Sequence, residues 1–235
     1  MIIVKGVSMD KCQKWYNDIA KRNNGYKSDA RFIKEGLSGE DVFEKRLIKL
    51  LPNYNHVLDI GCGHGEFSLK MSKYAKHLTG GDSAVELINI ANHLKKKEDI
   101  KNVDFIYFHT HEIESFEGLK FDLIYNRRGP TSIYDYKRLL STGGMIISIH
   151  PLYALDKVKQ RLTNGGFKDI KIEVFNECKL IFDSVTDFAE HISSMHMSKD
   201  YTLEINREEL DKLVEKHTNN GRLSLCEERF IVTAS

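Results

Sequence analysis

Between residues 57 and 149, short apolar runs alternate with amphipathic stretches that repeat with a helical period. The apolar runs predict five strands, at 57–60, 78–81, 103–108, 121–125 and 145–149. The intervening stretches predict helices, at about 66–76, 84–96 and 134–140. Such alternation requires a parallel sheet with right-handed crossovers and helices on both faces, so the predicted fold class is α/β with a doubly wound sheet.

The last third of the chain departs from this alternation. We predict a helix, a strand, a mostly helical insertion and a final strand, at 155–163, 168–175, 176–226 and 228–234. One helical face of the insertion carries apolar side chains, which are Phe188, Ala189, Ile192 and Met195. Asn206 and Glu209 have the spacing of a capping box at the start of a second helix there.

The first fifty residues are predicted to be helical, in two segments. The first segment carries apolar side chains on one face, which are Trp15, Tyr16, Ile19 and Ala20. Ser38 can cap the second segment, which must end at Leu51 because Pro52 cannot continue it. We therefore expect a single domain, divided into an N-terminal helical cap, a core, a helical insertion and a final strand, at 1–52, 53–175, 176–226 and 227–235.

Composition argues against several classes of protein. Lysine plus arginine number 35 and aspartate plus glutamate 34, so the chain lacks the positive field typical of nucleic-acid binding. The four cysteines show no metal or disulfide spacing, which favours a reducing, cytoplasmic location without a metal site. The chain has no run of 18 apolar residues and no apolar start typical of a signal peptide, so we expect neither export nor membrane insertion.

The strand at 57–60 runs directly into a glycine-rich turn, Gly61-Cys62-Gly63-His64-Gly65, that opens the next helix. Open α/β sheets bind ligands at such a turn. Glu66 stands where a phosphate loop would have a lysine and a dinucleotide site a small residue, and its carboxylate would repel phosphate. Asp59 adds an acid at the end of the strand, so the ligand should offer a cationic group.

Asp82 ends the second predicted strand, 17 residues after Gly65. An acid at about this distance can accept hydrogen bonds from the hydroxyl groups of a ribose. A nucleoside that carries an amine and no phosphate suits both Asp59 and Asp82. S-adenosyl-L-methionine is a molecule of this kind.

The runs Asp59-Ile60-Gly61-Cys62-Gly63-His64-Gly65 and Gly80-Gly81-Asp82-Ser83 resemble the class I S-adenosylmethionine-dependent methyltransferase family. The resemblance extends from about Val57 to the final strand. It implies a seven-stranded, mostly parallel sheet with an antiparallel last strand, in an enzyme that binds S-adenosyl-L-methionine. It places Asp59 near the methionine amino group and Asp82 on the ribose. The cofactor-binding residues implied here are Asp59, Gly61, Cys62, Gly63, Asp82 and Ser83.

Two further segments match the family less closely. Where the family usually has an acid that contacts the adenine amino group, this chain has His109 and Thr110. These residues or nearby backbone groups are candidate adenine contacts, and an ordinary loop is the alternative. Asn126 lies where methyl donor and acceptor should meet and is a further candidate cofactor contact. The segment lacks the Asn-Pro-Pro-Tyr signature, which argues against adenine and glutamine amino groups as acceptors.

Three residues are candidates for the catalytic side of the site. His150 ends the fifth strand and could act as a general base if the acceptor must lose a proton. The alternative is a structural histidine bonded to its surroundings. Arg127 and Arg128 could clamp a carboxylate or phosphate of the acceptor, or could form surface ion pairs.

The expected function is methyl transfer to a small-molecule acceptor held under a hood of N-terminal and inserted helices. Trp15, Tyr16 and Tyr26 could contribute aromatic faces to this hood or could pack as core. We do not expect nucleic acid or a membrane as a partner, and we expect a monomer or a homodimer. One alternative is an RNA base methyltransferase that uses the arginines and the lysines at 95–97. The other is a non-catalytic cofactor-binding module, which His109 in place of an acid would favour.

Overall fold

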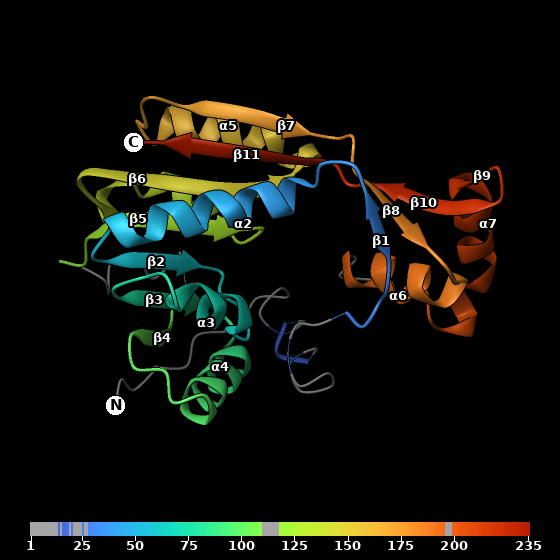
Figure 1. Cartoon of the computed structure of the whole chain (residues 1–235), viewed down its shortest axis with the longest axis horizontal. Coiled ribbons are helices and arrows are strands. Elements are labelled where there is room, and N and C mark those ends of the chain that lie inside the picture. Colours follow the sequence, from blue (N-terminus) through green and yellow to red (C-terminus); the bar gives the residue numbers. More distant parts are fainter. Residues whose placement is uncertain are drawn as a thin grey trace.

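The computed structural model describes residues 14, 16–18, 20, 25, 28–109, 118–195 and 199–235. A seven-stranded sheet in the order β4-β3-β2-β5-β6-β11-β7 forms its centre (Figure 1). Its strands in chain order are β2 (Val57–Ile60), β3 (Leu78–Asp82), β4 (Val103–Tyr107), β5 (Phe121–Arg127), β6 (Leu140–Pro151), β7 (Lys171–Phe175) and β11 (Arg229–Ala234). The five strands from β2 to β6 pair in parallel, and β11 runs antiparallel to both β6 and β7. The predicted doubly wound sheet is confirmed.

Alternate residues of the central strands face two separate apolar cores. On β5, Leu123 belongs to one core cluster and Ile124 to the other, as expected when successive side chains point to opposite faces. The first cluster contains Phe43 and Leu47 of α2 (Gly39–Leu50) together with residues of α3 (Glu66–Ser72) and α4 (Val85–Lys97). The second contains Val158 of α5 (Leu155–Asn164). Helices therefore cover both faces of the sheet.

Helix α2 begins and ends close to the predicted positions. The Ser38 side chain accepts a hydrogen bond from the Asp41 amide, which satisfies one of the free amides of the first turn. The helix ends at Leu50 and is followed by the 3₁₀ turn η1 (Leu51–Asn53), which contains Pro52. Further 3₁₀ turns replace the predicted helix at 134–140, and these are η3 (Thr131–Asp135) and η4 (Lys137–Leu139).

A second, antiparallel sheet, which was not predicted, joins the insertion to the N-terminal segment. Its strands, in the order β1-β8-β10-β9, are β1 (Ile33–Glu35), β8 (Lys179–Phe182), β10 (Arg222–Cys226) and β9 (Thr218–Asn219). Two predicted helices are present beside it, α6 (Val185–Met195) and α7 (Arg207–His217). The prediction of mostly helical segments at 1–52 and 176–226 was therefore incomplete, because β1 from the first segment pairs with β8 from the second.

The insertion has an apolar core of its own, in which Phe188, Ala189 and Ile192 of α6 are buried as predicted. Met195, at the end of α6, is 51% exposed. One detail of the prediction was wrong. The capping box does not form, because the side-chain amide of Asn206 donates to the Asp200 carbonyl and Glu209 pairs with Lys199.

The second sheet lies at the edge of the main sheet where the parallel strands end. It connects to the main sheet through two short links, from Phe175 to Lys179 and from Cys226 to Arg229. Arg229 at the start of β11 pairs with Pro151 at the end of β6, so these links leave at the carboxyl edge (Figure 1). Open α/β sheets bind their ligands at this edge. Among the described residues, no helix has the length and apolar character needed to cross a membrane.

Candidate active site

The glycine-rich turn joins β2 to α3 at the carboxyl edge of the sheet. The amides of Gly61 and Cys62 both donate to the Gly81 carbonyl of β3, at 2.8 and 3.1 Å, which fixes the turn against the neighbouring strand. A Cβ at Gly61 would lie 2.9 Å from both Gly129 Cα and Pro130 Cδ, so only glycine allows this approach. Gly63 has φ of +58°, and no atom of the described residues lies within 4 Å of its Cβ position. The crest of the turn is therefore open to a ligand.

Asp82 lies directly beside this crest. One carboxylate oxygen accepts from the Gly63 amide and the other from the Ala84 amide, both at 2.9 Å. Burial raises the pKa of Asp82, and bonds from the amides of Ala84, Gly63 and Ser83 oppose that rise. Each carboxylate oxygen has two acceptor positions, so Asp82 can hold the turn and still accept from a hydroxyl group. The structure thus brings Gly63, Asp82 and Ser83 together, as the sequence predicted.

Asp59 was expected to be a charged side chain that faces the open crevice, but the structure buries it. Its side chain is only 2% exposed and accepts hydrogen bonds from Ser68 at 2.5 Å and Tyr125 at 2.9 Å. Burial raises the pKa of Asp59 to about 7, although both hydrogen bonds and the charge of Arg127 favour the ionised form. The difference arises because Tyr125 pairs with Asp59 in register on β5, and Ser68 of α3 covers the same carboxyl group. Sequence reasoning missed both partners.

The other cofactor candidates lie around the turn in different roles. Cys62 is half-buried, and burial followed by the charges of Asp82 and Asp59 raises the pKa of its thiol. Asn126 is fully buried, accepts from the Gly129 amide at 2.6 Å and donates to the Pro130 carbonyl at 3.1 Å. Asn126 therefore shapes the loop that covers Gly61. His109 follows β4 and is half-buried, and Thr110 lies outside the described residues.

His150 is not open to an acceptor in this structure. It is 2% exposed, and its Nε2 lies 2.9 Å from the hydroxyl group of Tyr134. Tyr134 also contacts Ser148 through a short hydrogen bond. Burial lowers the pKa of His150 to about 4, although the charge of Glu40 opposes this effect. A buried, neutral and hydrogen-bonded imidazole corresponds to the alternative of a structural histidine, since a general base must reach the proton that it removes.

Arg127 and Arg128 lie at the end of β5, and both pair with Glu40 in the first turn of α2. Arg127 Nε lies 2.9 Å from Glu40 Oε2, and Arg128 Nε lies 3.2 Å from Glu40 Oε1. The Arg127 guanidinium also covers the ring of Phe67, 4.6 Å from its centroid. Burial raises the pKa of Glu40, but the charges of Arg128, Arg127 and Arg229 outweigh burial and hold it below its usual value. Sequence reasoning missed Glu40 as the common partner.

The N-terminal aromatic residues proposed for a hood are only partly described. Trp15 and Tyr26 lie outside the described residues, as does Ile19. Tyr16 packs against a small apolar cluster that includes Ala84 and Leu87, at the start of α4. Asn17 accepts a hydrogen bond from the Glu86 amide in the same region. The described N-terminal residues therefore lie next to the segment that follows Asp82.

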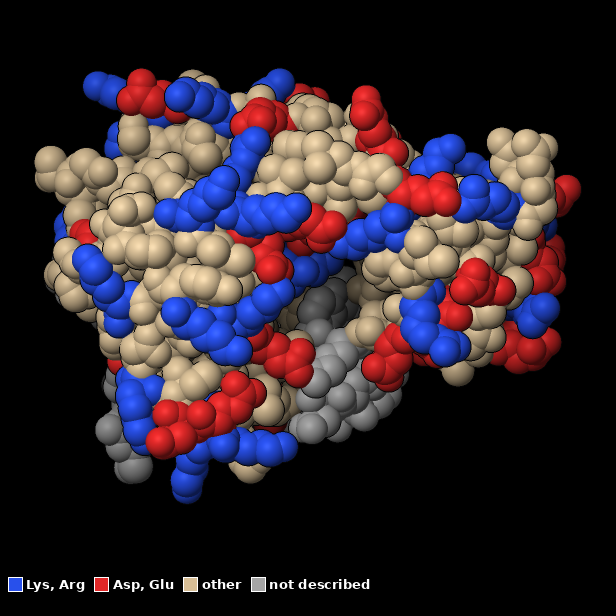
Figure 2. Space-filling model, in the orientation of Figure 1, with Lys and Arg blue, Asp and Glu red and all other residues tan. Residues whose placement is uncertain are grey.

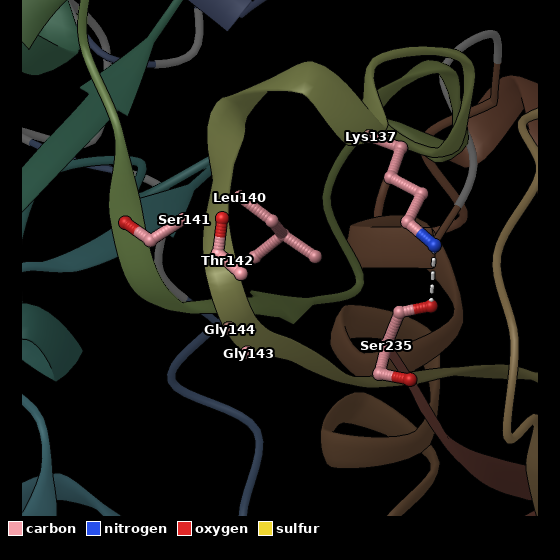
Figure 3. A pocket seen from close by; sticks show the side chains of 7 residues that line it. All are labelled: Lys137, Leu140, Ser141, Thr142, Gly143, Gly144 and Ser235. Atoms are coloured by element: carbon pink, nitrogen blue, oxygen red, sulfur yellow. Dashed lines mark hydrogen bonds between the residues drawn. The ribbon is translucent and has the colours of Figure 1, made fainter.

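A depression on the opposite edge of the sheet is separate from this site (Figure 3). It lies at the amino end of β6, and its lining residues are Lys137, Leu140, Ser141, Thr142, Gly143, Gly144 and Ser235. The Lys137 ammonium group donates to the Ser235 carbonyl there at 2.8 Å. Since this depression faces away from the glycine turn, it contributes nothing to the site at the carboxyl edge.

Comparison with known proteins identifies the fold. A family model described as a methyltransferase domain matches residues 53–208. A 23S rRNA (uracil(1939)-C(5))-methyltransferase of Vibrio parahaemolyticus is 30% identical over 49% of this chain and 28% of its own length. A demethylmenaquinone methyltransferase of Leptospira interrogans is 26% identical over 57% of each chain. This chain thus spans less than two thirds of either relative.

A solved structure shows the same fold over nearly the whole chain. It is a functionally unknown protein from Deinococcus radiodurans R1, with a TM-score of 0.68 and 21% identity, and the match covers 94% of this chain and 98% of that one. At this identity the likeness concerns the fold alone. Because the match covers 94% of this chain, it extends beyond the main sheet and its helices.

The residues of the site are compatible with S-adenosylmethionine. Gly63 leaves open space beside the turn, and Asp82 keeps acceptor capacity for a ribose hydroxyl group. The Glu66 side chain is 49% exposed at the start of α3, where it opposes the binding of a phosphate. Because the family model covers most of the chain and the site suits the cofactor of that family, this protein belongs to the class I S-adenosylmethionine-dependent methyltransferases.

Proposed function

We propose that this enzyme transfers the methyl group of S-adenosylmethionine to a small-molecule acceptor. The observation that carries the proposal is the position of the second sheet and α6, which continue from β7 and β11 at the carboxyl edge. A structure at this edge can enclose a small acceptor between itself and the end of β5. The nearly balanced charge of the chain also favours a small molecule over RNA, whose binding requires phosphate contacts.

We assign the cofactor to the glycine turn. Gly61 and Gly63 let the backbone approach it, and Asp82 accepts from its ribose. Cys62 lies in the turn between the two glycines. Ser83 follows Asp82, and its amide supports the Asp82 carboxylate. His109 and Thr110 stay candidates for the adenine, as the residues that follow β4. Asn126 acts by holding the loop that covers Gly61.

Asp59 has a different role in this proposal from that of an open negative charge. Its pKa of about 7 lets a nearby cation draw it into the ionised form at neutral pH. Tyr125 and Ser68 both donate to that carboxylate and fix its position. The amino group of the cofactor would supply the cation. Asp59 thus supports cofactor binding from below the turn.

The chemistry chiefly requires alignment. The bound cofactor supplies a methyl group on a sulfonium, and a nucleophile displaces it in line. Positioning of this kind contributes about 7 to 11 kcal/mol to catalysis in favourable cases. Within this chain, Asn126 fixes the loop at 128–130, and the Arg127 guanidinium packs on Phe67 beside the turn. These contacts give the acceptor side of the site a defined shape.

Incubation of the protein with S-adenosylmethionine labelled with tritium in the methyl group tests the proposal. A cell extract is separated into small molecules, RNA and protein, and each fraction is offered as acceptor. We expect label to enter the small-molecule fraction. Label only in RNA would contradict the proposal and favour the activity named for the Vibrio relative. Cofactor binding with no transfer to any fraction would instead indicate a non-catalytic binding module.

A further inference from the structure

Three arginine side chains converge on a single carboxylate beside the proposed acceptor site. Arg127 and Arg128 come from the end of β5, and Arg229 comes from the start of β11. All three pair with Glu40, and Arg229 Nε lies 3.4 Å from Glu40 Oε1. Glu40 has only two carboxylate oxygens for three guanidinium groups. We call these four residues the arginine cluster.

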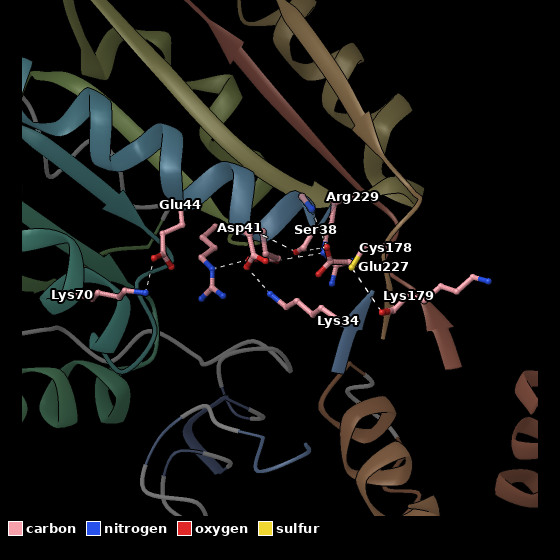
Figure 4. A network of polar contacts seen from close by, with 12 residues as sticks. Lys34, Ser38, Asp41, Glu44, Lys70, Cys178, Lys179, Glu227 and Arg229 are labelled. Carbon is pink, nitrogen blue, oxygen red and sulfur yellow. Dashed lines mark hydrogen bonds and ion pairs between the residues drawn. The ribbon is translucent and has the colours of Figure 1, made fainter. Parts of the chain in front are cut away.

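The neighbouring acidic groups do not balance this excess of positive charge. Asp41 pairs with Lys34 and Glu44 pairs with Lys70, both at 2.6 Å (Figure 4). Glu227 accepts from the Ser38 hydroxyl group at 2.7 Å and from the Gly39 amide at 3.0 Å, both at the start of α2. These donors are neutral, so the Glu227 carboxylate offsets one guanidinium charge, and three guanidinium groups face two carboxylates. Within the described part of the chain, the arginine cluster therefore carries more positive than negative charge.

The arginine cluster lies between the glycine turn and the insertion. On one side, the Arg127 guanidinium covers Phe67, which follows the turn. On the other side lies His191 of α6. Burial lowers the pKa of His191 to about 4, and the nearby charges of Arg229 and Arg128 act in the same direction. In Figure 2, lysine and arginine side chains line the upper rim of the hollow between the main sheet and the second sheet, and acidic side chains also border this hollow. This is the region in which the acceptor should bind.

Arg128 is held in an unusual conformation at this place. Its φ is +63°, which is uncommon for a residue with a side chain and destabilises the backbone there. The Arg128 amide donates to the Ile149 carbonyl at 2.9 Å, and the Asn126 side chain fixes the following residue, so the surrounding structure imposes the strain. The Arg128 side chain is 42% exposed and can reach a ligand. The Arg229 side chain, across Glu40 from it, is 12% exposed, and its Nη1 donates to the Glu228 carbonyl at 3.0 Å.

We propose that Arg128 and Arg229 bind an oxyanion, a carboxylate or a phosphate, of the methyl acceptor. Guanidinium groups bind both anions through paired hydrogen bonds. Glu40 acts as a positioning residue that holds the arginines close together before the acceptor enters. The inference rests on the proposed function, since it concerns the acceptor of that same site. It adds Arg229 and Glu40 to the acceptor side and restricts the acceptor to an anionic small molecule.

Binding of simple anions tests this inference without knowledge of the acceptor. The protein saturated with S-adenosylhomocysteine is titrated with inorganic phosphate, and separately with acetate, at constant ionic strength. Binding is followed by the arginine Nε–Hε resonances in NMR spectra. We expect Arg128→Gln and Arg229→Gln to raise the Kd of the bound anion about tenfold. The control Arg46→Gln removes an exposed ion pair with Glu173 on the sheet and should leave the Kd unchanged.

Equal anion affinity in all four proteins, or no anion binding to the wild type, would overturn the inference. A variant that still binds S-adenosylhomocysteine is folded. If Arg229→Gln does not fold, Arg128→Gln still tests the inference. A second arm offers small molecules separated on an anion-exchange resin as acceptors. Label from the anionic fraction supports the inference, and its loss after phosphatase treatment identifies phosphate. Label only from the neutral and cationic fractions contradicts the inference but leaves methyl transfer to small molecules intact.

Discussion

The buried carboxyl group of Asp59 should make the stability of the protein depend on pH. Its pKa is about 7 in the folded chain, against 3.8 for the ordinary group. An acid with a raised pKa binds its proton more tightly in the folded state. The contribution of Asp59 to the free energy of unfolding is therefore largest below pH 3.8 and falls as pH rises toward 7. The full loss is about 4 kcal/mol, at about 1.36 kcal/mol for each pH unit.

Asp59→Asn removes the ionisation and keeps the shape of the side chain. Between about pH 5 and pH 8, the wild type should lose about 2 to 3 kcal/mol of unfolding free energy through Asp59, and the variant should not. Altered hydrogen bonds to Ser68 and Tyr125 add a cost of about 1 kcal/mol that is nearly the same at both pH values. The variant should therefore gain stability relative to the wild type as pH rises.

Urea unfolding of the cofactor-free protein, followed by circular dichroism at both pH values, measures this difference. Other titrating groups act equally in both proteins and cancel in the comparison. Asp156→Asn is the matched control, because Asp156 is an exposed acid on α5 and should change by less than about 0.5 kcal/mol between the two conditions. A similarly small change for Asp59→Asn would mean that Asp59 is already ionised near pH 5, and the burial argument would be wrong.

Substitutions at three other residues test separate parts of the structure. Asp82→Ala should weaken the binding of S-adenosylhomocysteine by about 1.5 to 3 kcal/mol in calorimetry, and unchanged affinity would remove Asp82 from the site. Gly61→Ala should lower the free energy of unfolding by about 1 to 3 kcal/mol, because its Cβ would lie 2.9 Å from Gly129 Cα at a φ of +77°; a gain in stability would contradict this contact. Ser38→Ala should cost about 1 kcal/mol in urea unfolding through loss of the helix cap and of the bond to Glu227, whereas Ser38→Thr should retain most of it.

The main sheet could be predicted because each of its signals is local. The strand at 57–60 and the helix that follows Ser38 depend on residues close together in sequence, and both begin where the pattern places them. The pairing of Gly63 with Asp82 was also predictable, because the carboxyl ends of β2 and β3 lie side by side. Elements that depend on such local patterns are present in the structure at nearly the predicted residues.

The second sheet and the arginine cluster could not be predicted in the same way. Strand β1 has only three residues, and its partner β8 lies far away in sequence, so no local alternation reveals the pair. Glu40 meets Arg229 for the same reason, since only the folded sheet brings α2 next to β11. The state of Asp59 depends on its burial under Ser68 and beside Tyr125, which the sequence does not state.

The most direct test of the account is competition for the glycine turn. The protein without cofactor is titrated by calorimetry with S-adenosylhomocysteine, and then with NAD⁺ or ATP, alone and as competitors. We expect S-adenosylhomocysteine to bind with a Kd at least about tenfold lower than that of either phosphate-bearing nucleotide. We also expect neither nucleotide to displace it. Tighter binding of NAD⁺ or ATP, with displacement of S-adenosylhomocysteine, would contradict a site built from Glu66, Asp82 and the open turn at Gly63.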